Sequence, residues 1–224
     1  MFDFLMMPLS FQIFGIAGSI IAVIGSLIAA IAYRGKQGQT YSPLNHFISE
    51  LGEVGVSRLA WVFNLGLILT GLCLVVAVLG LGLMLPGWLA RVALVAGVVC
   101  AVGLSFVGFF PMNQLTLHTR AAMTFFRGGL AMVILFSLAI GFQSPAKSVI
   151  SPWYALAGLP AIAAFSTFLV LIAKATQHTD EPLGTEEVTR PRIRVLAVVE
   201  WSIFLTILLW FLLIAVGLPA WASA

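Results

Sequence analysis

Two histidines and one glutamate are the residues of this chain best suited to acid–base chemistry near neutral pH. His46 and Glu50 stand four residues apart in the segment SPLNHFISELG (residues 42–52), so their side chains would meet on a helix. His118 lies in a second polar segment, NQLTLHTR (residues 113–120). A histidine exchanges protons at physiological pH, and two histidines with one carboxylate can hold a divalent metal. These three are therefore the candidate catalytic residues and, if a metal binds, its expected ligands; no cofactor follows from the pattern.

The elements that would position these residues are long apolar helices. Of the 224 residues, 61% are hydrophobic and 8% are charged, and the mean hydropathy is +1.11. Soluble domains carry about a quarter charged residues, whereas runs of about 20 apolar residues can cross a bilayer as helices. The sequence predicts an all-α membrane protein, a single domain over residues 1–224. The six predicted spans are residues 12–33, 58–83, 89–109, 119–142, 153–174 and 195–217.

The polar segment between the first two spans is predicted to form a short amphipathic helix at the membrane surface. Ser42 can cap such a helix, Pro43 fits its first turn and Gly52 fits its end. Its apolar residues share one face, at the spacing i, i+3, i+4, i+7: Leu44, Phe47, Ile48 and Leu51. Its polar residues share the opposite face: Asn45, His46, Ser49 and Glu50.

Three polar residues stand inside the apolar runs: Asn64, Arg127 and Glu200. Each lies roughly six to eight residues from the end of its run on the side of His46 and His118, which is about 10 Å at 1.5 Å per residue. Charges at membrane depth are costly and normally face a partner or a water-filled cavity. We expect Arg127 and Glu200 to form an ion pair at the floor of a cavity open to one side. The candidate ligand-binding residues are Asn45, Ser49, Asn64, Asn113, Arg120, Arg127 and Glu200.

Lysine and arginine are divided unequally between the two sides of the predicted membrane domain. The first, third and fifth connections and their helix ends hold eight: Arg34, Lys36, Arg58, Arg120, Lys174, Arg190, Arg192 and Arg194. The other side holds only Arg91 and Lys147. Because basic residues concentrate in cytoplasmic loops, we expect a multi-pass protein of the cell membrane with these three loops in the cytoplasm and both termini outside.

Three short motifs carry a family resemblance. They are residues 49–52 (SELG) after the first span, Asn64 in the second, and Phe110-Pro111 with His118 before the fourth. The arrangement resembles the bacterial six-span membrane proteins catalogued as domain of unknown function 998, distant relatives of the DRAM-like and GPI-lipid-remodelling membrane proteins. That family often carries an acid shortly after its Phe-Pro, where this chain has Met112-Asn113. The resemblance implies the six-span fold and, through the distant relatives, a lipid-related role.

Three functions are compatible with these features. The favoured one is non-catalytic: the protein binds membrane lipid or a membrane-protein partner through the one-sided polar cavity. The first alternative is a hydrolase or transferase acting on lipid headgroups, although the sequence has neither a GxSxG elbow nor an HExxH motif. The second alternative is a small-solute transporter, gated by the Arg127–Glu200 pair. Nucleic acid is not expected as a partner.

Overall fold

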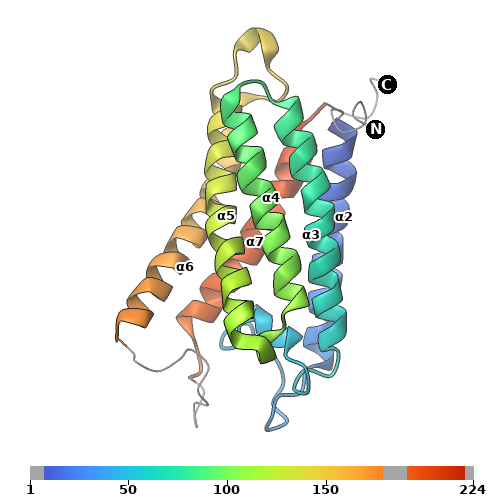
Figure 1. The fold of residues 1–224 in the computed structure, drawn as a ribbon, viewed down its shortest axis with the longest axis vertical. Coiled ribbons are helices and arrows are strands. Elements are labelled where there is room, and N and C mark those ends of the chain that lie inside the picture. The colour runs from blue at the N-terminus through green and yellow to red at the C-terminus, as the bar shows by residue number, and fades with distance from the viewer. Residues whose placement is uncertain (1–7, 179–190, 220–224) are drawn as a thin grey trace.

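Six long helices form a bundle in the computed structural model, with the first four nearly aligned and the last two tilted against them (Figure 1). They are α2 (Pro8–Ala32), α3 (Ala60–Met84), α4 (Trp88–Phe109), α5 (Leu115–Gly141), α6 (Leu159–His178) and α7 (Val195–Gly217). The structure describes residues 8–178 and 191–219. The two termini and most of the fifth loop lie outside these residues, and so does the prediction of their membrane side. Within the described residues there is no β-strand, and all six helices are long and apolar enough to cross a membrane.

Consecutive helices from α2 to α5 pack side by side as antiparallel neighbours, while α6 leans outward and α7 passes behind α4 and α5 (Figure 1). Small residues allow the backbones to approach closely, as is usual between membrane helices. A Cβ on Gly71 of α3 would lie 2.6 Å from the carbonyl oxygen of Ala101 in α4. A Cβ on Gly103 of α4 would lie 2.9 Å from the backbone nitrogen of Phe125 in α5. Both positions therefore require glycine.

The helix ends lie within a few residues of the apolar runs. The helices α2 and α5 each begin four residues earlier than predicted, at Pro8 and Leu115. The fifth span begins as the 3-10 helix η4 (Pro152–Gly158) and continues as α6. Pro160 falls in the first turn of α6, where its missing N–H costs no helical hydrogen bond.

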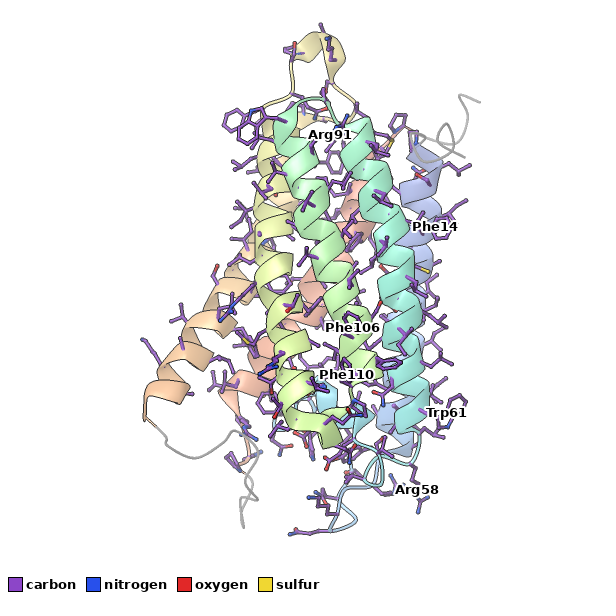
Figure 2. The ribbon with its side chains drawn as sticks, in the orientation of Figure 1. Phe14, Arg58, Trp61, Arg91, Phe106 and Phe110 are labelled. Atoms are coloured by element: carbon purple, nitrogen blue, oxygen red, sulfur yellow. The ribbon has the colours of Figure 1, made fainter. Side chains whose placement is uncertain are left out.

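The two ends of the bundle differ in character. We call the end that carries the first loop (residues 33–59) the first-loop end; Arg58 and Trp61 lie there, and Arg91 marks the opposite end (Figure 2). The half toward the opposite end is filled by large side chains that are almost fully buried: Phe11, Leu81, Leu85, Phe136, Ile140 and Trp210. The buried ionisable groups of the helices, His118 and Glu200, lie nearer the first-loop end, as does the buried amide of Asn64. At the opposite end the buried amide of Gln12 donates to the carbonyl oxygen of Ala215.

Candidate functional site

The first loop folds into the end of the bundle instead of lying on the membrane surface. Residues 43–45 form a turn and residues Ile48–Gly52 form the 3-10 helix η1, so the predicted amphipathic α-helix is wrong. The side chains of His46 and Glu50 are only 2% and 5% exposed, whereas Leu44 on the supposed apolar face is 52% exposed. Leu51 of the apolar face is buried as well, so burial in this segment does not separate the two predicted faces; His46 and Glu50 point inward, where they have ring and hydrogen-bond partners. We call residues 41–54 the plug.

Aromatic rings hold the centre of the plug. The ring of His46 packs against Tyr33 and Tyr41, with centroid distances of 5.3 and 5.1 Å. The Tyr41 hydroxyl donates to the carbonyl oxygen of Phe47 at 2.9 Å and accepts a hydrogen bond from Trp201 Nε1 at 2.9 Å. Burial raises the pKa of Tyr41 above its ordinary value of 10.0. The hydroxyl therefore stays protonated and can donate over the physiological pH range.

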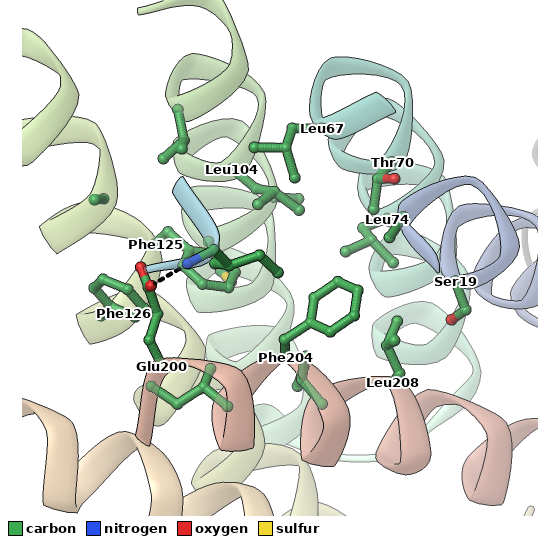
Figure 3. Close-up of a pocket in the computed structure, with 18 of the residues that line it drawn as sticks. Ser19, Leu67, Thr70, Leu74, Leu104, Phe125, Phe126, Glu200, Phe204 and Leu208 are labelled. Atoms are coloured by element: carbon green, nitrogen blue, oxygen red, sulfur yellow. Dashed lines mark hydrogen bonds between the residues drawn. The ribbon is translucent and has the colours of Figure 1, made fainter. Parts of the chain in front are cut away.

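The start of α7 fastens the plug from one side. The carboxylate of Glu200 accepts a hydrogen bond of 2.7 Å from the Ile48 backbone N–H (Figure 3). The Arg194 backbone N–H donates to the Leu44 carbonyl oxygen at 2.8 Å. The guanidinium carbon of Arg194 lies 4.6 Å from the centre of the Phe47 ring. The bond to Glu200 satisfies a backbone N–H that would be costly to bury without a partner.

Two asparagines fasten the other side of the plug. Asn64 of α3 donates through Nδ2 to the carbonyl oxygen of Gly52 at 3.0 Å, and it packs so closely that Gly52 has no room for a side chain. Asn113, in the link between α4 and α5, makes two bonds to Val54: Oδ1 accepts from its N–H at 2.8 Å and Nδ2 donates to its carbonyl at 2.9 Å. Both asparagines thus satisfy the loop's backbone.

A chamber opens above the plug, between α2, α3, α4, α5 and α7. Its cavity volume is about 90 Å³; the space free of protein atoms reaches about 940 Å³ only when the part open to the surroundings is included. Most of the wall is apolar, with Leu104, Phe126, Phe204 and Leu208 prominent among its side chains (Figure 3). Two wall hydroxyls are already bonded to backbone: Ser19 to Gly15 O at 2.7 Å, and Thr70 to Gly18 O at 3.1 Å.

The remaining polar wall residues gather at the plug end of the chamber: Ser49, His118 and Glu200. His118 lies in the first turns of α5, and its Nδ1 is 2.7 Å from the carbonyl oxygen of Phe110. That bond assigns a proton to Nδ1, which leaves Nε2 as an acceptor when the ring is neutral. The chamber therefore combines a long apolar wall with one polar end that can both donate and accept hydrogen bonds.

The expected metal ligands are not assembled. In the part of the chain that the structure describes, no group of three or more His, Cys, Asp or Glu residues is placed to hold a metal ion. His46 is packed between tyrosines and His118 is bonded to Phe110. Glu50 accepts a 2.9 Å hydrogen bond from the Phe47 N–H. Each side chain has a different structural partner, and the three do not converge.

The expected ion pair between Arg127 and Glu200 is also wrong. Glu200 is buried at the chamber, whereas Arg127 is exposed on the outer side of α5. Arg127 follows His118, which lines the chamber, by nine residues, about two and a half helical turns, so the two point to opposite sides of α5. The sequence places Arg127 and Glu200 at a similar depth in the membrane. The two side chains nevertheless do not meet, because Arg127 is on the side of α5 that faces away from the chamber.

The sequence-predicted residues therefore fall into four places. The chamber receives Ser49, His118 and Glu200; the plug holds Asn45, His46 and Glu50; the fastening amides are Asn64 and Asn113; the outer face of α5 carries Arg120 and Arg127. The sequence reading missed Tyr33, Tyr41 and Trp201, which hold the plug. Aromatic residues near the ends of spans usually mark the membrane interface, so their positions alone give no sign of such a role.

A model of the family described as protein of unknown function (DUF998) matches residues 16–217. The chain belongs to this family. Every wall residue of the chamber lies within the DUF998 match, from Ser19 to Phe211. The comparisons with curated proteins and with solved structures give no match.

Proposed function

We propose that this DUF998 membrane protein binds one acyl chain of a membrane lipid in its chamber, with the lipid's polar end held beside Ser49, His118 and Glu200. The observation that carries the proposal is the shape of the chamber: a long apolar wall with polar groups at one end. Along α3 the wall runs from Phe63 to Val78, about 22 Å at 1.5 Å per residue. An acyl chain crosses about half of a 30 Å hydrocarbon core, or about 15 Å.

Selection between lipids would come from the polar end. An acyl chain gains little by leaving the bilayer for another apolar environment, because both exclude water. Burying a polar headgroup without partners is costly, so the bound lipid must pair with the side chains it meets. The carboxyl group of Glu200 can accept hydrogen bonds, and so can Nε2 of the neutral His118 ring. These groups favour a ligand whose polar end carries hydroxyl or amine donors.

The packing of the opposite half favours a binding site over a path across the membrane. The described wall of the chamber ends near Val78, Gly97 and Phe211. Beyond it lie Leu81, Leu85 and Ile140, with no exposed surface. Such a chamber supports lipid binding and gives less support to a transporter.

We also propose that the first-loop end faces the cytoplasm of a cell, because most lysines and arginines lie there. We propose membrane lipids as the partners. We also propose that the protein is distantly related to lipid-remodelling membrane proteins. Single cysteines introduced at Arg58 and Arg91 would test the orientation. A membrane-impermeant thiol reagent added outside intact cells should label the Arg91 position and not the Arg58 position; the reverse would reject it.

The chamber is tested by filling it. Ala122 of α5 lines the chamber, whereas Ala163 of α6 is exposed to the outside. Purified protein should carry a tightly bound lipid that native mass spectrometry detects. Ala122→Leu, which adds three carbon atoms, should lose that lipid while the thermal unfolding temperature is maintained. The matched variant Ala163→Leu should keep it.

Two results would contradict the proposal. One is wild-type protein that carries no lipid after gentle solubilisation in any mild detergent. The other is Ala122→Leu protein that retains the wild-type amount of lipid.

A further inference from the structure

The helix α5 carries a second polar surface on the side turned away from the chamber. Thr119, Arg120, Met123, Thr124 and Arg127 line a depression there, and we call this set the basic face of α5. Arg120 and Arg127 are seven residues apart, about two helical turns, and so lie on one side of the helix. Both arginines are exposed.

The position of Arg127 along the helix makes its exposure costly. A 30 Å hydrocarbon core takes about 20 residues of helix. Exposed aromatic residues at the opposite end, Phe142 and Trp88, mark one edge of that core. Counted back from Gly141, the other edge falls at about residue 122, which puts Arg127 about 7 Å inside it and Arg120 at the surface. An arginine at this depth normally has an anionic partner or reaches for the interface.

The protein supplies no such partner in the residues that the structure describes. No carboxylate there forms an ion pair with Arg127 or Arg120, and Glu200 is on the other side of α5 at the chamber. The Thr124 hydroxyl donates to the Arg120 carbonyl oxygen at 2.9 Å and is used within the helix. The two guanidinium groups therefore face the surrounding lipid with their donors available.

We propose that the basic face of α5 binds the phosphate of an anionic phospholipid of the surrounding leaflet. Arginine side chains at membrane depth bend toward the membrane surface. Arg127, which lies deeper than the phosphate, and Arg120, which lies at the surface, can therefore approach one phosphate. Guanidinium groups match phosphate geometry with paired donors, and Thr119 adds a hydroxyl at the same depression. A zwitterionic headgroup would bring its own cation toward the two positive charges, so a net-negative lipid fits better.

This site is independent of the acyl-chain chamber, because it lies on the opposite side of α5. The two can therefore be tested separately. Ala122→Leu should leave the basic face unchanged, and arginine substitutions should leave the chamber lipid in place.

The test measures phosphatidylglycerol binding to the full chain in phosphatidylcholine nanodiscs. Arg127→Gln and Arg120→Gln should each weaken binding at least about fivefold, since each removes a guanidinium group that donates charge-assisted hydrogen bonds to the phosphate. Arg127→Lys keeps the charge but loses the paired donors, so its affinity should fall between wild type and Arg127→Gln. Arg58→Gln is the matched control, because it removes one exposed arginine from the same end of the bundle, and it should bind like wild type.

Three outcomes would overturn the proposal. Arg127→Gln could bind phosphatidylglycerol as wild type does, which would mean that Arg127 only reaches for water. Arg58→Gln could weaken binding as much as Arg127→Gln, which would mean a nonspecific effect of net charge. Soluble glycerol phosphate could compete with the lipid at equal concentration, which would mean a site for free anions. If Arg127→Gln does not fold, Arg120→Gln and Arg127→Lys give the same decision.

Discussion

The hydrogen bond between Glu200 and the plug permits a quantitative prediction. Glu200→Ala removes the acceptor that lies 2.7 Å from the Ile48 N–H. A hydrogen bond contributes about 0.5–1.5 kcal/mol, and a buried donor left without a partner costs about 1–3 kcal/mol. We therefore expect the free energy of opening the plug to fall by about 2 kcal/mol. Because 1.4 kcal/mol is a factor of ten, its local opening should become about 30-fold more frequent.

Hydrogen–deuterium exchange of the backbone amides in Ile48–Gly52 measures this opening directly. Glu200→Gln provides an internal comparison, because its amide oxygen can still accept from the Ile48 N–H. Exchange in Glu200→Gln should rise only about fivefold, the effect of about 1 kcal/mol. Ser202→Ala is the control on the same helix: its hydroxyl bonds to the Val198 carbonyl within α7 and should not affect the plug.

The reasoning would be refuted by exchange in Glu200→Ala that stays within twofold of wild type. It would also be refuted if Ser202→Ala increased exchange by the same factor, since the effect would then come from α7 as a whole.

Two further predictions concern the plug. Asn113→Ala removes both hydrogen bonds to Val54 and should raise the rate of proteolysis near Val54 about fivefold, the effect of about 1 kcal/mol at a partly solvated site, while Gln114→Ala should not. Because the pKa of Tyr41 is raised in the folded state, only the unfolded chain loses this proton as the pH rises above 10. Wild-type stability should then fall by up to about 1.4 kcal/mol per pH unit relative to Tyr41→Phe in unfolding titrations between pH 9 and 11; parallel curves would contradict the assignment.

The helices could be predicted from sequence because a bilayer imposes a length and a composition on each span. The all-α fold and the six membrane-spanning helices are confirmed, and the last helix spans residues 195–217 as expected. The family match over residues 16–217 agrees with the resemblance seen in the motifs around Glu50, Asn64 and Phe110-Pro111.

The site was only partly predictable, for reasons that particular residues make clear. Periodicity placed Leu44 on a different face from His46 and Glu50, but it could not tell which face meets water. The first loop is held by Glu200, bonded to the Ile48 N–H, and by Trp201, bonded to the Tyr41 hydroxyl, and both come from a distant part of the chain. Distance along a helix could not tell that Arg127 turns outward. The chamber is a space left between five helices, and no single segment encodes it.

The attachment of the plug also sets an order for assembly during synthesis. Ile48 and Glu200 are separated by 152 positions, so the hydrogen bond between them must wait for the last helix. At about 5–20 residues per second, the ribosome takes about 8–30 s to cover that distance. During this interval the buried polar groups of the first loop lack their α7 partners and stay with water or the insertion machinery. A chain that stops before α7 would leave the Ile48 N–H and the Tyr41 hydroxyl permanently without their α7 partners, and quality-control proteases could recognise it as an unfinished membrane protein.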